Sequence, residues 1–167
     1  MSSADKATGR LSLSLCDIEP LLRETIAHGT SFPMTTHGTS MLPLIRDGVD
    51  TVFLAALPDV LTPGDILLYK RPDGQYVLHR LMGVCGDECL FCGDHQQLFE
   101  RGIKKDALIA RAVALQKNDA PEETVDFLTD PSYLAYQKAL LKEKWHKHRM
   151  QTFRRLVHDF FRFLHIK

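Results

Sequence analysis

The chain has 167 residues, 44% of them hydrophobic, and carries 21 basic and 21 acidic residues. We expect a single domain with a sizeable core, because this length does not fit a second large domain. The balanced charge argues against nucleic acid as a partner of the whole body, and no apolar run of about 18 residues predicts a membrane-spanning helix.

The first 31 residues are predicted to form a disordered lead, over residues 1–10, and then a short helix. From Asp17 to Ala27 the apolar side chains recur at helical spacing, and His28-Gly29 supplies a stop signal. Charged residues within the first thirty positions interrupt any apolar segment of signal-peptide type. We therefore expect no secretory signal.

The pattern becomes strand-like after Gly29, where short apolar segments alternate with turns rich in Gly and Pro. Arg71-Pro72-Asp73-Gly74 indicates a hairpin turn, because Pro fixes φ and Gly accepts the left-handed conformation. Gly86-Asp87-Glu88 indicates a second hairpin. We predict strands over residues 31–36, 50–54, 66–70, 76–84, 89–92 and 108–115. Residues 32–125 are thus expected to be a mainly β domain, a coiled sheet or a barrel.

Residues 126–167 are predicted to be a basic, amphipathic helical tail. Apolar residues between Phe153 and Leu164 recur with the spacing of one helical stripe. From Lys142 to Lys167 there are eight Lys and Arg against two acidic residues, a local charge of +6 that leaves −6 on the rest of the neutral chain. Two alternatives stay open: peripheral contact of the tail with an anionic membrane, or packing of the stripe on the β domain.

Three of the four cysteines lie close together as Cys85-x3-Cys89-x2-Cys92. This spacing resembles the iron–sulfur triad of radical SAM enzymes, but that chemistry needs a large βα barrel and this chain shows no alternation of strands and helices. Along a strand, Cys89 and Cys92 also point to opposite faces. We therefore expect no metal and no cofactor, and reduced thiols in a cytoplasmic protein.

Three short segments contain residues suited to acyl transfer: Gly38-Thr39-Ser40-Met41-Leu42-Pro43, Val77-Leu78-His79-Arg80-Leu81 and Cys92-Gly93-Asp94-His95. Ser40 is a candidate nucleophile, and a serine hydroxyl needs a neighbouring base to remove its proton. His79 suits that task because an ordinary imidazole, with a pKa of about 6.5, is mostly neutral near pH 7.

In order and spacing these segments resemble the signal peptidase / LexA-type serine peptidase superfamily, whose motifs are Ser-Met-x-Pro, a Lys-Arg or His-Arg pair in a strand, and Gly-Asp. The resemblance covers roughly residues 32–115. The His-Arg pair is similar to the endoplasmic-reticulum and archaeal signal peptidases, in which serine pairs with histidine. The resemblance implies a serine endopeptidase that cleaves a peptide, preprotein or leader peptide through an acyl-enzyme, with small side chains near the cleaved bond.

Residue by residue, the resemblance assigns the nucleophile to Ser40 and the base to His79. Asp94 would accept a hydrogen bond from His79 and hold its tautomer, and Glu100, six positions later, is a candidate supporting acid. The backbone amides of Ser40 and Thr39 are the oxyanion candidates, because Gly38 stands where some related enzymes have a serine hydroxyl.

Other interpretations stay open at this point. Lys70 is the rival base, as the only lysine between Ser40 and His79, whereas His37 and His95 receive no role. A LexA-type repressor is a second rival, although about thirty residues before the strand region are too few for a DNA-binding domain and a cleavable linker. A non-catalytic peptide-binding or scaffold module on the same fold is the alternative of a different class. We expect a cytoplasmic location, at a membrane surface if the tail binds lipid.

Overall fold

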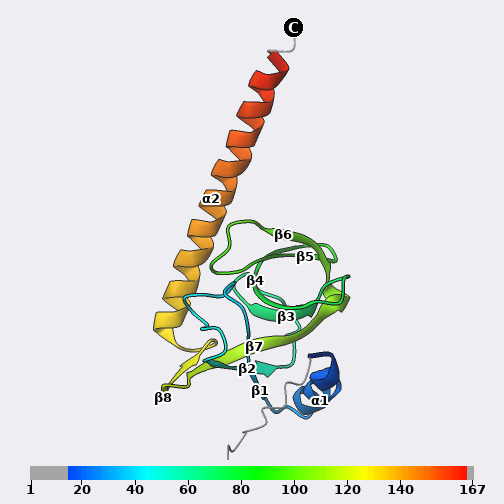
Figure 1. Cartoon of the computed structure of the whole chain (residues 1–167), viewed down its shortest axis with the longest axis vertical. Helices are drawn as coiled ribbons and strands as arrows, with labels where there is room; N and C mark the ends of the chain where they lie inside the picture. The colour runs from blue at the N-terminus through cyan, green and yellow to red at the C-terminus, as the bar shows by residue number, and fades with distance from the viewer. Residues whose placement is uncertain (1–14, 165–167) are drawn as a thin grey trace, which may run out of the picture.

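The computed structural model describes the backbone of residues 15–164 and the side chains of residues 15–154. Within that range, eight strands form one antiparallel sheet, preceded by one helix and followed by another (Figure 1). The prediction of a mainly β fold is confirmed. The sheet curls but does not close, so it is a coiled sheet and not a barrel. The lead predicted over residues 1–10 lies outside the described residues.

The N-terminal helix α1 (Leu15–Ala27) confirms the helix predicted from the apolar spacing. It ends before Gly29, whose φ of 76° is a left-handed conformation that glycine adopts without strain. Leu22 and Ile26 are buried in the main core, whereas Leu21 on the opposite face is 55% exposed. The helix is therefore held against the sheet by one apolar stripe.

Every predicted strand forms, and longer loops, over residues 36–50 and 56–65, connect the first three strands. The strands are β1 (Phe32–Thr35), β2 (Thr51–Ala55), β3 (Ile66–Lys70), β4 (Tyr76–Cys85), β5 (Glu88–Cys92), β6 (Glu100–Lys104), β7 (Leu108–Lys117) and β8 (Ala120–Asp126). Their order across the sheet is β1-β2-β7-β3-β4-β5-β6, and β8 also pairs with β7. A 3-10 turn, Lys105–Ala107, precedes β7.

Strands β6 and β8 were not predicted, because neither shows the alternation of apolar and polar residues that marks a half-buried strand. In β6 only Ile103 is buried, and Gly102 has a φ of 76°. β8 begins Ala-Pro-Glu-Glu and is mostly exposed. It pairs with β7 alone, a position in which Pro121 is tolerated because an edge strand leaves some backbone donors unpaired.

Strand β3 is buried on both faces and divides the core into two clusters. Ile66 and Leu68 pack into the main cluster beneath α1, and Leu67 and Tyr69 into a second cluster inside the curl of β3–β6. Because side chains alternate along a strand, this placement turns Tyr69 toward the inside of the curl. His79 pairs with Leu67 across β3 and β4 and therefore lies on the same face.

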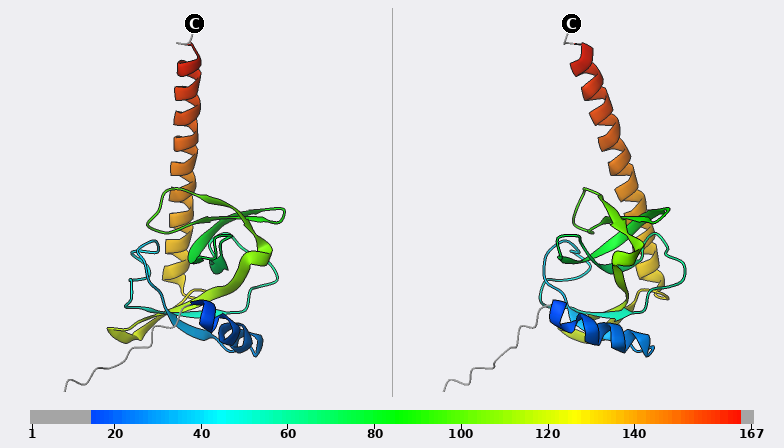
Figure 2. Two further views of the ribbon diagram at one scale, coloured as in Figure 1. Left: turned by 45° about the vertical axis from the view of Figure 1, so that its right-hand side comes forward. Right: turned by 90° about the vertical axis from the view of Figure 1, so that its right-hand side faces the viewer.

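The C-terminal helix α2 (Pro131–Leu164) packs its first half along the body and then continues beyond it (Figures 1 and 2). Tyr133 is buried in the main core, whereas Met150 and Phe153 are 50% and 63% exposed. The rest of the predicted apolar stripe, from Leu156 onward, lies outside the described side chains. Neither helix in the described range combines the length and the apolar character that crossing a membrane requires.

The two adjacent leucines of α1 provide a matched test of its docking. Leu22→Ala should lower the free energy of unfolding by about 2–5 kcal/mol, because it leaves a cavity at a fully buried position. Leu21→Ala, at the exposed neighbour, should change it by less than about 0.5 kcal/mol. Urea unfolding followed by circular dichroism measures both; equal effects of the two substitutions would contradict the packing of α1 described above.

Candidate active site

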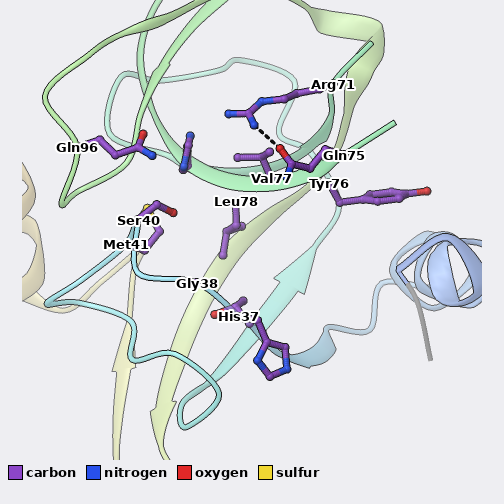
Figure 3. A pocket seen from close by; sticks show the side chains of 12 residues that line it. His37, Gly38, Ser40, Met41, Arg71, Gln75, Tyr76, Val77, Leu78 and Gln96 are labelled. Carbon is purple, nitrogen blue, oxygen red and sulfur yellow. Dashed lines mark hydrogen bonds between the residues drawn. The ribbon is translucent and has the colours of Figure 1, made fainter. Parts of the chain in front are cut away.

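Ser40 and His79 line one open pocket of about 220 Å³ (Figure 3). Ser40 comes from the loop between β1 and β2 and is partly exposed, whereas His79 comes from β4 and is only 2% exposed. The side chains of Gln96 and Ser40 lie on the same side of this pocket in the figure. The structure thus brings together the two residues to which the sequence assigned the nucleophile and the base.

The loop that carries Ser40 is fixed at its start by a side chain further along the same loop. The Asp47 carboxylate accepts a hydrogen bond from the Gly38 amide at 2.9 Å. At the end of the loop, the fully buried Asp50 accepts hydrogen bonds from Arg46 and from Lys117 of β7, so the loop is also attached to the sheet. A surface loop of this length therefore has a defined shape around Ser40.

The turn after β5 presses directly against this loop. The His95 amide donates a hydrogen bond to the Ser40 carbonyl at 2.8 Å. A Cβ atom on Gly93 would lie only 2.6 Å from the same carbonyl oxygen, so the turn can approach this closely only with glycine there. The glycine of the Gly-Asp motif is thus explained by the position of Ser40.

Helix α2 supports this turn from the other side. Lys144, with 9% exposure, donates from Nζ to the Gly93 carbonyl at 2.9 Å and also to the Gln96 carbonyl. Phe99 stacks on His148 with ring centroids 4.3 Å apart and meets Trp145 edge to face. Helix α2 therefore holds the segment between β5 and β6 whose Gly93 and His95 lie against Ser40.

His79 is bonded to a chain of polar side chains inside the curl of the sheet. Its Nδ1 lies 3.2 Å from the Tyr69 hydroxyl, which donates to Glu100 Oε2 at 2.8 Å. Arg71 binds the same carboxylate through two nitrogens, at 2.5 and 2.6 Å. Since the single hydroxyl proton of Tyr69 goes to Glu100, the tyrosine oxygen accepts the proton of His79 Nδ1. The lone pair of the imidazole is then on Nε2.

Burial controls the protonation of these groups. It lowers the pKa of His79 to about 4, an effect that the nearby Glu100 carboxylate opposes and Arg71 reinforces. Burial also raises the pKa of Tyr69, which keeps its hydroxyl protonated. Although burial works against the charge of Glu100, its bonds to Arg71 and Tyr69 hold the pKa of that carboxyl below its ordinary value. His79 is therefore neutral and Glu100 ionised near pH 7.

Asp94, expected to orient His79, forms a buried ion pair with Arg80. Its two oxygens accept from Arg80 Nε and Nη2 at 2.8 and 2.7 Å, and both side chains are 1% exposed. Tyr136 of α2 also donates to Asp94, at 3.4 Å. Glu100 approaches His79 Nδ1 to 3.7 Å. The carboxylate that the structure places beside the histidine is thus the expected supporting residue, Glu100.

The remaining candidates are placed as follows. Lys70 lies outside the pocket, 41% exposed, with its Nζ 4.0 Å from Glu19 and over the ring of Tyr76. Its bond to Tyr76 raises the pKa of Lys70, which works against a role as a proton acceptor. His37 lines the pocket but is exposed, 3.5 Å from Asp47. Thr39 is exposed in the loop beside Ser40.

The cysteines do not gather into a ligand set. Cys16 and Cys85 are exposed, Cys89 and Cys92 are buried, and all four are free thiols. Among the described residues, no group of three or more His, Cys, Asp or Glu side chains is arranged to hold a metal ion.

Sequence reasoning missed Tyr69, Arg71 and Lys144. Tyr69 stands in an uninterrupted apolar segment, where a tyrosine is indistinguishable from a core residue. Arg71 belongs to a turn and Lys144 to a helix with many charges, so neither was distinguished from a solvated surface residue. Only the strand alternation that puts Tyr69 and His79 on one face was available as a signal.

Comparison with protein-family models, with curated proteins and with solved structures finds no match to this chain.

The close approach of Gly93 to Ser40 is testable with two glycine substitutions. Gly93→Ala should destabilise the protein by about 1–3 kcal/mol, because its Cβ has to push a backbone oxygen aside. Gly83→Ala is the control: its Cβ would meet nothing closer than Trp145 at 3.9 Å, and φ is not left-handed at either position. Thermal unfolding of both variants measures the difference; a Gly93→Ala variant as stable as Gly83→Ala would contradict the contact.

Proposed function

We propose that this protein is a serine endopeptidase of the signal-peptidase type, with Ser40 as the nucleophile and His79 as the base. The observation that carries the proposal is the shared pocket, which is lined by a partly exposed serine and by a buried, neutral histidine. Its opening on one side suits a peptide segment as substrate. The motifs described above support the same assignment.

The tautomer of His79 agrees with the base role. Nδ1 is engaged with Tyr69, so Nε2 is the nitrogen left to take the Ser40 proton. The serine oxygen then attacks the peptide carbonyl, and the leaving amine takes that proton as the acyl-enzyme forms. Water, deprotonated by the same nitrogen, attacks the ester. The ester bond breaks, the peptide fragment leaves with a new carboxyl group, and the Ser40 oxygen takes the proton back from Nε2. The Ser40 and Thr39 amides are proposed to stabilise the negative charge on the attacked carbonyl oxygen.

Glu100, in place of Asp94, is proposed to support the histidine. When Nε2 accepts a proton the imidazolium carries a positive charge, and the ionised Glu100 at 3.7 Å favours that charge. Tyr69 connects these two residues and fixes the orientation of the imidazole, because its hydroxyl accepts a hydrogen bond from His79 Nδ1 and donates one to Glu100. Asp94 acts through Arg80: their ion pair fixes the backbone of β4 next to His79 and the turn after β5 that contacts Ser40.

The alternative function is a non-catalytic peptide-binding or scaffold module, which three substitutions separate from the proposal. Ser40→Ala and His79→Ala should each lower the turnover of any accepted peptide by about 10⁴-fold or more, because the two act as one unit. Lys70→Ala should lower turnover by less than about 10-fold, since that side chain lies outside the pocket of Ser40 and His79.

Peptide cleavage is measured by mass spectrometry, and circular dichroism confirms that each variant is folded. An inactive Lys70→Ala beside an active His79→Ala would assign the base to lysine. Turnover that survives in Ser40→Ala would reject the serine mechanism.

The pH dependence of cleavage tests the role of Glu100. An ordinary imidazole predicts an acid limb near pH 6–7, but burial moves it to about pH 4, because the base must be neutral and the pKa of His79 is lowered to about 4. Since Glu100 raises that pKa, Glu100→Gln should move the acid limb to still lower pH and reduce kcat by at least about 10-fold.

Glu88→Gln, at an exposed position on β5, is the control and should leave the acid limb unchanged. Unfolding must be measured at each pH, because the unfolded chain protonates His79 first and stability falls from about pH 6.5 toward pH 4. An acid limb that stays in place or rises in Glu100→Gln would exclude the proposed effect.

The projecting half of α2 is proposed to attach the enzyme peripherally to anionic membranes at the cytoplasmic surface. Beyond the hydrogen bond between Gln151 and Gln97 of the body, Phe153 is exposed next to Arg154. Met150 is exposed beside Arg149 one turn earlier. Apolar side chains flanked by basic ones suit the boundary between anionic headgroups and acyl chains.

Liposome flotation tests the attachment with the full chain. The double variant Met150→Glu/Phe153→Glu should float at least about 10-fold less with vesicles that contain an anionic lipid, because it loses both the apolar contact and the charge match. Val60→Glu, at an exposed position on the β2–β3 loop, is the control and should float like the wild type. Equal flotation of all three proteins, or none by the wild type, would reject membrane attachment.

A further inference from the structure

A second pocket, of about 350 Å³, lies between α1 and the strands next to the candidate site. We call it the α1 pocket. Its apolar wall is formed by Pro72, Ile103, Ala107 and Ile109, and α1 contributes Glu19 and Arg23 on the other side. The described machinery of cleavage does not use this wall. It is large enough for a Leu, Met or Phe side chain.

The α1 pocket adjoins the pocket of Ser40 and His79. Arg71 lines both of them. Tyr76, which lines the first, points toward α1 (Figure 3) and bonds to Glu19, which lines the second. A peptide that leaves the first pocket along β4 and passes Tyr76 therefore comes to the rim of the α1 pocket.

The strand geometry sets the distance between the two pockets. Tyr76 precedes His79 by three residues on β4, which corresponds to about 10 Å at a strand rise of about 3.3 Å per residue. An extended peptide beside β4 has nearly the same rise. The side chain that reaches the α1 pocket is then about three to four residues away from the bond positioned at Ser40.

From this arrangement we infer that the α1 pocket is a specificity subsite for a large aliphatic or aromatic side chain of the substrate, about three to four residues from the cleaved bond. The inference rests on the proposed peptidase function and adds to it the class of substrate: an extended peptide with a distant apolar anchor. Burial of such a side chain against Ile103 and Ile109 is the source of the selectivity.

The charges at the rim refine the choice of peptide. Arg71 is paired with Glu100, and Arg23 with Glu19 at 2.8 Å. Lys70 and Lys104 add two positive charges to the rim, and Asp106 one negative charge. A basic side chain is therefore repelled from the α1 pocket, and an acidic residue next to the apolar anchor is accepted.

The test uses the full-length protein and peptides of about ten residues built around a central Ala-Ala. Leu, Ala or Lys stands three or four residues from that centre, on either side. The wild type should cleave one Leu peptide with a kcat/KM about 10-fold above its Ala counterpart, the range expected when an apolar pocket discriminates by side-chain size, and the Lys peptide should be worst. Binding of the same peptides to Ser40→Ala is followed by fluorescence anisotropy.

Two variants test whether the α1 pocket is the source of the preference for Leu over Ala and Lys. Ala107→Phe fills the α1 pocket and should abolish the difference between the Leu and Ala peptides. Lys104→Glu, at an exposed position that does not risk the fold, should raise cleavage of the Lys peptide. Val60→Phe, a bulky change at an exposed position outside both pockets, is the control and should keep the Leu preference.

The outcomes separate the subsite from the proposed function. Cleavage without a Leu preference, or a preference that Ala107→Phe and Val60→Phe alter equally, overturns the subsite and leaves the peptidase intact. Absence of cleavage together with Leu-dependent binding that Ala107→Phe removes supports the subsite and overturns the peptidase. Absence of both cleavage and binding overturns both.

Discussion

The buried pair of Arg80 and Asp94 joins β4, the turn after β5 and helix α2 around the candidate site. Arg80 follows His79 on β4, and Asp94 follows Gly93 in the turn that contacts Ser40. The same guanidinium donates to the Gly64 carbonyl at 2.9 Å and to the Tyr133 hydroxyl of α2 at 3.0 Å. Burial opposes the charge of Arg80, but Asp94 outweighs that effect and raises its pKa. Loss of either partner would leave a buried charge uncompensated, at a cost of about 3–5 kcal/mol.

The ion pair also explains two dipeptides of the sequence, His79-Arg80 and Gly93-Asp94. In each dipeptide one residue faces the pocket and its neighbour fixes the backbone: strand alternation points His79 into the curl and Arg80 out of it. Gly93 permits the contact with Ser40, and Asp94 anchors the turn that makes it. Helix α2 completes the arrangement through Lys144, so the helix is part of the site's support and not an appendage to the β domain.

Local signals were enough to predict α1 and the strands with clear apolar patterns, such as β3, and to single out Ser40 and His79. They failed where structure depends on distant partners. β6 and β8 are strands because β5 and β7 offer them hydrogen bonds, and their own residues carry no alternation. Asp94 and Glu100 both come after β5 in the sequence, and the residues around them do not show which of the two carboxylates lies beside His79. The register of β5 with β6 and the position of Arg80 decide that Glu100 does.

The polar chain around His79 argues against a purely structural role for it. Tyr69 belongs to the second core cluster, the neutral His79 beside it is buried, and the side chains of Arg71 and Glu100 are only 28% and 22% exposed. Burial of such polar groups is unfavourable, and apolar residues of similar volume in such places are often neutral or stabilising. A scaffold would gain from that replacement. The proposed peptidase would use the arrangement as it stands: Tyr69 sets the tautomer of His79, Arg71 keeps Glu100 ionised, and Glu100 would favour the imidazolium that acyl transfer requires. Polar groups retained in a core at this energetic disadvantage are expected where a site does chemistry.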